Sequence, residues 1–103
     1  MSTVHYSYRI DGNLLAIEDL MGEVAVTMVA EQVLRDIRAE VGSLEGLYVI
    51  WRDRQGIWDG MEFFNGQLFF YPIGETGYDQ ARTRLLSLAP DLGECWIIRD
   101  ALL

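Results

Sequence analysis

Several residue types that support common protein chemistry are scarce or missing in this chain. It has no lysine, so it can form no lysine Schiff base and lacks the phosphate-binding lysine of a P-loop. It has one cysteine, Cys95, which cannot form a disulfide within the chain, and one histidine, His5. These two residues are too few for a zinc site of histidines and cysteines. We expect no metal and no cofactor.

Long apolar runs and a secretion signal are also lacking. No apolar run approaches the roughly 18 residues that a membrane helix needs. The first five residues lack the basic and apolar regions of a signal peptide. We therefore expect a cytoplasmic protein that does not bind membranes. The 103 residues are 50% hydrophobic, which suffices for one folded domain over residues 1–103.

Positive charge is the next shortage. Eight arginines stand against sixteen acidic residues, and the net charge is −8. The acidic residues are spread evenly, without an acidic tail. A protein that binds nucleic acid directly normally carries a basic patch, so we expect no direct nucleic-acid binding. The charge favours a partner protein with a basic surface, and it also keeps a small domain in solution.

Turn signals divide the rest of the chain, beginning with a predicted hairpin. Residues 6–10 alternate between apolar and polar, which is typical of a strand. Asp11-Gly12 is a two-residue hairpin signal, and residues 14–18 then form the return strand. In this register Tyr8 faces Leu15.

A change of period marks the first helix, over residues 23–41. Valine and isoleucine recur there at three- and four-residue steps, as in an amphipathic helix, and Gly42 is a plausible C-terminal cap. The first turns are rich in valine, so residues 24–28 could instead extend the hairpin.

The strongest strand signal lies in the middle of the chain. Residues 46–52, 57–64 and 67–73 are apolar and β-prone, and Asn65-Gly66 is a second two-residue hairpin turn. A helix over residues 78–88 and a last strand over residues 94–99 follow. Thr76 and Asp79 resemble a capping box at the start of that helix. The predicted order is ββ-α-βββ-α-β, an α+β fold with a mostly antiparallel sheet and two helices.

The Asn65-Gly66 turn predicts the two faces of its hairpin. It pairs Phe64 with Gln67, and one face is then wholly apolar, as a core should be. A sheet with one wet side should carry polar residues on its other face, yet this second face is also largely aromatic. It therefore must be covered or used for binding. The residues on it are Trp58, Gly60, Glu62, Phe64, Gln67, Phe69, Tyr71 and Ile73.

Three explanations of this aromatic face stay open. The second helix or the region of the last strand could pack on it as a second core. Two copies could bury it in a homodimer. It could also dock another protein, because aromatic side chains are enriched in interfaces. The charged loop at residues 52–54 would then orient the partner, or it is simply a solvated turn. The candidate partner-binding residues are Trp58, Asp59, Glu62, Phe64, Phe69, Tyr71, Arg52, Asp53 and Arg54.

Catalytic arrangements are poorly supplied, and we expect no enzyme. His5 is predicted to face Glu18, where an exposed ion pair is far commoner than a general base. Cys95 stands beside apolar residues and is interpreted as a small buried side chain. Asp59 and Glu62 are placed on opposite faces of one strand, which argues against a shared acid–base site.

These observations favour a small acidic protein-binding module of the inhibitor or immunity type, for example a phage-type anti-defence inhibitor. It would occlude a basic, nucleic-acid-handling partner through the aromatic face. The alternative is an acidic dimeric chaperone or assembly subunit that holds a client segment. In that hypothesis the client uses the same face or adds a strand to an exposed edge at residues 46–52.

Overall fold

Six strands form one sheet in which the order of the strands in space is their order in the chain. The computed structural model describes residues 6–19, 26–53 and 55–100. Neighbouring strands are antiparallel, except that β2 and β3 are parallel. The predicted α+β class and the predicted order of elements are confirmed. The strands are β1 (Tyr6–Asp11), β2 (Leu14–Asp19), β3 (Tyr48–Arg52), β4 (Trp58–Phe64), β5 (Gln67–Glu75) and β6 (Trp96–Asp100).

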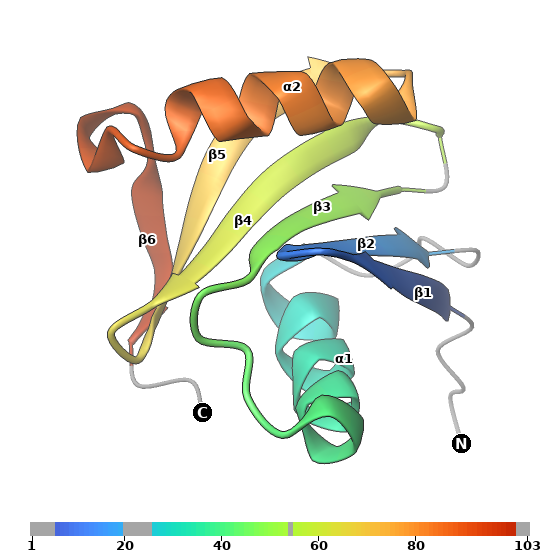
Figure 1. Cartoon of the computed structure of the whole chain (residues 1–103), viewed down its shortest axis with the longest axis vertical. Helices are drawn as coiled ribbons and strands as arrows, with labels where there is room; N and C mark the ends of the chain where they lie inside the picture. The colour runs from blue at the N-terminus through green and yellow to red at the C-terminus, as the bar shows by residue number, and fades with distance from the viewer. Residues whose placement is uncertain (1–5, 20–25, 54, 101–103) are drawn as a thin grey trace.

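Two helices cover opposite faces of this sheet (Figure 1). Helix α1 (Val26–Val41) connects the parallel strands β2 and β3, and helix α2 (Tyr78–Leu88) follows β5. A short 3-10 helix, η1 (Leu92–Glu94), leads into β6. The Cα radius of gyration is 12.5 Å, close to the roughly 13 Å expected of one compact domain of this length.

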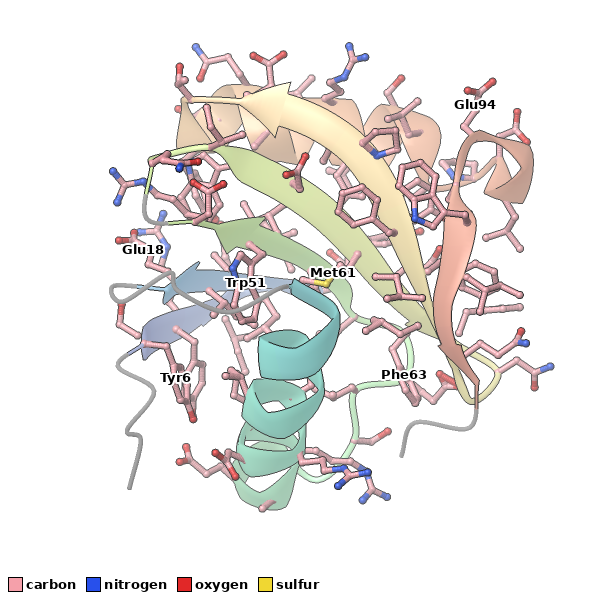
Figure 2. The ribbon with its side chains drawn as sticks, turned by 180° about the vertical axis from the view of Figure 1, so that it is seen from behind. Tyr6, Glu18, Trp51, Met61, Phe63 and Glu94 are labelled. Atoms are coloured by element: carbon pink, nitrogen blue, oxygen red, sulfur yellow. The ribbon has the colours of Figure 1, made fainter. Side chains whose placement is uncertain are left out.

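The face under α1 is an apolar core. Alternation along each strand sends one set of side chains to this face, and Trp51, Met61 and Phe63 lie on it beside α1 in Figure 2. The helix contributes Val33, Leu34 and Ile37, which are all fully buried. This is the core that the hairpin pattern predicted, and Phe70 is only partly buried in it.

The opposite face is a second core, under α2. The alternate residues of the same strands pack there against Ala81 and Leu85 of the helix. Strands β2 and β3 therefore bury side chains on both faces. This explains why their sequences are nearly continuous apolar runs rather than alternating ones.

The predicted register is correct for one two-residue hairpin turn and wrong for the other. Asn65 and Gly66 both have positive φ, at 55° and 78°, and the predicted pairing of Phe64 with Gln67 is confirmed. The β1–β2 prediction was wrong by two residues, because the turn is centred on Gly12-Asn13 with positive φ at Gly12. Tyr8 therefore faces Ile17. A shift of two residues leaves every side chain on its predicted face.

The helix ends confirm one prediction and correct another. Helix α1 includes Val26, so a hairpin extension through residues 26–28 is excluded, and residues 23–25 lie outside the described residues. Its C-terminal cap is Gly42, with φ of 93°, whose N–H donates to the Arg38 carbonyl at 2.8 Å. Helix α2 has the predicted bounds, 78–88, but the predicted capping box is wrong, because its N-cap is the extended Gly77 rather than Thr76 and no side chain caps it.

The strand order also corrects one part of the chaperone hypothesis. Strand β3 lies between β2 and β4, so the segment at residues 46–52 offers no free edge to a client strand. The crossover through α1 places β3 parallel to β2, and the hairpin through residues 53–57 then pairs its other side. Within the described sheet the edges are β1 and β6.

Candidate functional site

Helix α2 covers most of the aromatic face, for which the sequence left open a second core, a dimer interface or a docking site. Trp58, Phe69 and Tyr71 are 4%, 8% and 0% exposed. Of the three open explanations, the second core is therefore the one found for these side chains. The hypothesis that these three side chains form an open docking surface is wrong, because a partner could reach them only after α2 had moved.

Close approach of α2 depends on a missing side chain at Gly60. A Cβ at this position would lie 2.6 Å from Cδ1 of Leu85 and 2.6 Å from Cδ1 of Ile73. The leucine of α2 thus fills the space above the glycine. The gap that the sequence suggested for a ring or a partner is occupied by the helix.

Glu62 and Tyr71 form a polar contact inside this core. The Tyr71 hydroxyl donates to Oε1 of Glu62 at 2.7 Å, and the carbonyl oxygen of Ala89 is a second acceptor at 3.1 Å. Burial raises the pKa of the Tyr71 phenol, and the Glu62 carboxylate raises it further. Through these two contacts Tyr71 links Glu62 of β4 to Ala89 at the C-terminal end of α2.

Asp59 serves the backbone of the neighbouring strand. The β4–β5 register shifts between Trp58 and Gly60. At this bulge Oδ1 of Asp59 accepts the N–H groups of Ile73 at 3.2 Å and Gly74 at 3.0 Å. The carboxylate replaces ladder partners that the bulge removes. Asp59 was predicted to contact a partner, and this structural role uses one of its oxygens.

The charged loop after β3 is organised as a turn. Oδ1 of Asp53 accepts the N–H groups of Gln55 at 2.9 Å and Ile57 at 3.0 Å. Arg52 forms an ion pair with Glu18, with Nη1 and Oε2 3.3 Å apart. Both side chains are about 40% exposed, so the pair contributes little to stability. Arg54 lies outside the described residues.

The register of β1 and β2 corrects the predicted pairing of His5 with Glu18, because Ser7 lies opposite Glu18. His5 lies outside the described residues, and the partner of the Glu18 side chain is Arg52. Cys95 is half-buried, and its Sγ donates to the Leu92 carbonyl at 2.9 Å. Partial burial raises the pKa of this thiol, a hydrogen bond with Tyr71 opposes the rise, and the Glu62 and Asp91 carboxylates add to it, so the net shift is away from the reactive thiolate.

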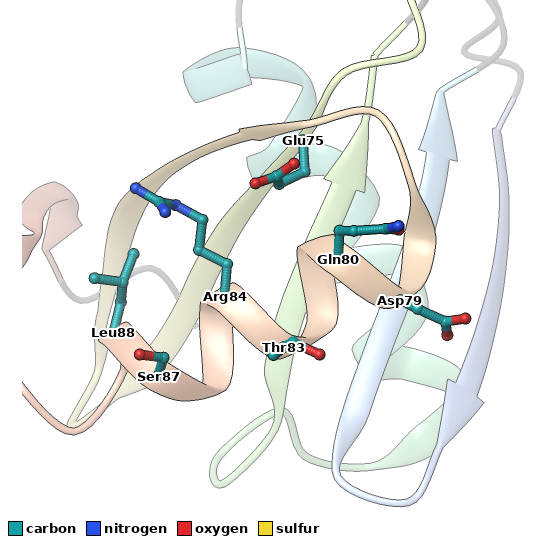
Figure 3. Close-up of a pocket in the computed structure, with 7 residues that line it drawn as sticks. All are labelled: Glu75, Asp79, Gln80, Thr83, Arg84, Ser87 and Leu88. Atoms are coloured by element: carbon teal, nitrogen blue, oxygen red, sulfur yellow. The ribbon is translucent and has the colours of Figure 1, made fainter.

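A shallow hollow lies on the outer side of α2 (Figure 3). It has a volume of about 520 Å³ and is wide open to solvent. Its charged side chains, Glu75, Asp79 and Arg84, are solvated rather than enclosed. Nothing in its lining resembles a reactive site.

The described residues contain neither a cluster of metal-ligating side chains nor a helix that could span a membrane. Within residues 6–19, 26–53 and 55–100, no three His, Cys, Asp or Glu side chains are close enough to hold a metal ion. Neither helix of that part of the chain combines the length and the apolar character needed to cross a membrane.

A set of exposed apolar side chains lies on and around the edge strand β6, distributed over both faces of the sheet. We call it the β6 surface; it consists of Phe64, Leu92, Trp96 and Ile97, which are 51%, 41%, 53% and 49% exposed. Phe64 is the member that the sequence prediction included. It is exposed because it lies at the β4–β5 turn, away from α2 (Figure 1). The Trp96 ring packs against Phe70, with ring centroids 4.7 Å apart.

Sequence reasoning missed the other three residues because it predicted the last strand without a place in the sheet, and Leu92 lies before that strand. One signal could have found them: Trp96, Ile97 and Ile98 are consecutive, so apolar side chains fall on both faces of β6. Helices cover both faces of the central strand β3, whereas β6 lies at the edge of the sheet and lacks such cover on both faces. Figure 2 shows β6 standing clear of α1, and α2 packs on β3, β4 and β5.

Comparison with known proteins adds no relative. No family model matches the chain, and neither a curated protein nor a solved structure resembles it significantly.

Proposed function

We propose that this protein is an acidic, non-enzymatic protein-binding module of the inhibitor type, which docks on a partner with a basic surface through the β6 surface. The observation that carries the proposal is the exposure of Trp96 and Ile97, about half of each side chain, on an edge strand. Phe64, at the β4–β5 turn, is also exposed, and the pairing of its partner Gln67 with Asp100 places it toward the other end of β6. Large apolar side chains that are exposed at an edge strand are accessible to a partner that contacts this edge, on either face of the sheet.

The composition of the β6 surface supports binding to protein. Tryptophan is enriched among the residues that dominate interface energies, where it works best inside a rim that excludes water. Seven large apolar side chains are exposed in the described residues, and four of them belong to the β6 surface. The remaining three, Ile10, Val41 and Leu86, are single exposed residues on other elements.

Charge supports a basic partner. The chain carries −8, and the exposed residues Asp91 and Glu94 lie directly before β6. Acidic side chains beside exposed apolar ones steer a basic partner into place and disfavour acidic partners. A basic surface is the electrostatic footprint of proteins that handle nucleic acid, so we place the partner in that class. The inhibitor would act there by occupying the surface.

The test is site-specific photo-crosslinking in an extract of the cells that make the protein. Benzoylphenylalanine is placed at Phe64, at Trp96 and, as a control, at Leu86 on the outer side of α2. We expect the first two positions to crosslink one protein with a basic surface, and position 86 not to. Trp96→Ser should abolish the Phe64 crosslink, whereas Leu86→Ser should preserve it.

Salt and self-crosslinking decide between the hypotheses. Raising salt from about 0.1 M to about 1 M shortens the screening length from about 10 Å to about 3 Å, so association with the captured partner should slow. Equal crosslinking from position 86, or an acidic partner, would contradict the proposal. Crosslinks between two copies of the chain would favour the dimeric chaperone or assembly subunit instead.

A further inference from the structure

We propose that β6 accepts an extended basic segment of the partner as a seventh strand of the sheet. The inference rests on the proposed function and specifies how its partner binds. Strand addition uses the unpaired N–H and C=O groups of an edge strand for affinity and the flanking side chains for specificity. Within the described sheet, β6 pairs with β5 alone.

The other edge strand is built differently. In β1 the residues Ser7, Arg9 and Asp11 are exposed and polar, a pattern that discourages pairing with another chain. The Arg9 guanidinium lies over the Tyr78 ring, 4.1 Å from its centroid, and the Tyr8 hydroxyl donates to Glu40. The side chains of β1 are thus engaged with the two helices.

Strand β6 instead presents apolar side chains on both faces of its edge. Trp96 pairs with Phe70 on the α1 face, and Ile97 pairs with Phe69 on the α2 face. An added strand would place its own side chains about 5 Å from these, on both faces at once. Side chains of a strand alternate between its two faces. Apolar residues at every second position of the segment would therefore cover one of these two side chains directly, either Trp96 or Ile97.

Charge selects the occupant. Glu94, which points away from the sheet at the start of β6 in Figure 2, and Asp91 are exposed beside the edge. A segment with arginine or lysine between its apolar residues would complement them. A second copy of this chain would bring another eight net negative charges and the same two carboxylates. The edge therefore fits a basic segment better than a second copy.

The experiment measures amide hydrogen exchange of the full chain with three probe peptides. The first is an acetylated, amidated heptapeptide of alternating arginine and valine. The second has the same sequence with alternate backbone nitrogens methylated, and the third has glutamate in place of arginine. With the first peptide at ten times its Kd, exchange of the outward β6 amides should slow about tenfold, because they exchange only while the peptide is dissociated. The other two peptides should give no protection.

A matched pair of variants locates the effect. Ile97→Arg places a repelling charge on the β6 edge, and Ile10→Arg places it on the β1 edge at similar exposure, 45% against 49%. The first should abolish protection by the arginine peptide, and the second should preserve it. Exchange and mass without peptide confirm that both variants fold.

The remaining outcomes overturn the inference. Equal protection by the methylated peptide would mean side-chain docking without strand addition. Equal protection by the glutamate peptide would remove the basic class of segment. Protected β6 amides in a dimer without peptide would assign the edge to a second copy. If position 96 crosslinks a basic partner while no peptide protects β6, the proposed function stands and strand addition fails. If a peptide protects β6 and nothing basic crosslinks, the proposed function fails.

Discussion

The two faces of the sheet bury apolar side chains under helices of different character. Helix α1 packs three aliphatic side chains against an apolar face of the sheet: Val33, Leu34 and Ile37. Helix α2 buries Ala81 and Leu85 on a face that also holds Glu62 and the hydroxyl of Tyr71. The second face looked like a binding surface because it mixes aromatic and acidic residues. The comparison shows that such a mixture can serve to seat a helix.

The largest test of this comparison sets two tryptophans against each other. Trp58 is 4% exposed and packs edge-on against Tyr78, with ring centroids 5.7 Å apart. Replacing it with alanine should cost about 3–5 kcal/mol of stability, the range for large aromatic residues in cores. Trp96 is 53% exposed, so its replacement should cost less than about 1.5 kcal/mol, mainly the contact with Phe70. Urea unfolding of both variants measures the difference. Similar losses would mean that α2 does not shield Trp58.

The next test probes the fit between Leu85 and Gly60. We expect Leu85→Ala to cost about 2–5 kcal/mol and Gly60→Ala, which overfills the same space, about 1–3 kcal/mol. In the double variant the leucine methyl group that clashes with the new Cβ is gone. The two costs should therefore sum to more than the double variant shows, by about 0.5 kcal/mol or more. Strictly additive costs would contradict the contact, and exposed Leu86→Ala is the control.

A smaller effect is expected at the β4–β5 bulge. Asp59→Ala removes the acceptor of two backbone N–H groups, at Ile73 and Gly74. Leaving these groups unpaired should cost about 1–3 kcal/mol, whereas Asp59→Asn keeps an oxygen in place and should cost less. Thermal unfolding measures both. Equal stability of the alanine variant and the parent would show that water replaces the carboxylate without loss.

The smallest effect at neutral pH is expected for Tyr71→Phe, about 1 kcal/mol for one hydrogen bond. Its signature is the dependence on pH. Burial and Glu62 raise the pKa of Tyr71 in the folded protein, so the folded state holds this proton more tightly than the unfolded chain. The resulting stability is complete below about pH 10 and is lost as the pH rises above it. Unfolding between pH 7 and pH 12 should show a shallower decline in the Phe variant. An unchanged slope would contradict the assignment.

Local signals predicted most of the fold and little of the site. The Asn65-Gly66 turn specified its own register because both residues adopt positive φ. Asp11-Gly12 misled by two residues because Gly12 occupies the first central position instead of the second. Strand order was beyond reach, since no local pattern tells that β3 enters parallel to β2. The cover by α2 was one of three open alternatives, because its apolar stripe is short and its fit depends on Gly60.

The candidate site depended even more on contacts between distant residues. Asp59 and Glu62 are ordinary acidic residues of a strand until the bulge and Tyr71 give them partners. The residues of the β6 surface became visible only when β6 was placed at an edge. Among the residues of the β6 surface, Phe64 is the one that was predicted. Its exposure follows from its position beside a turn, which the sequence shows, rather than from tertiary packing.

The order of the strands has a consequence for how the chain folds. Each strand pairs with the strand before it, so the sheet can grow from one side without waiting for a distant segment. Three of the five pairings close short loops, and the connections through α1 and through α2 are the two long ones. Short loops mean a low contact order, for which rapid folding is expected. The strand that joins such a growing sheet last is β6, and one more strand laid against it would continue the same process with another molecule's chain.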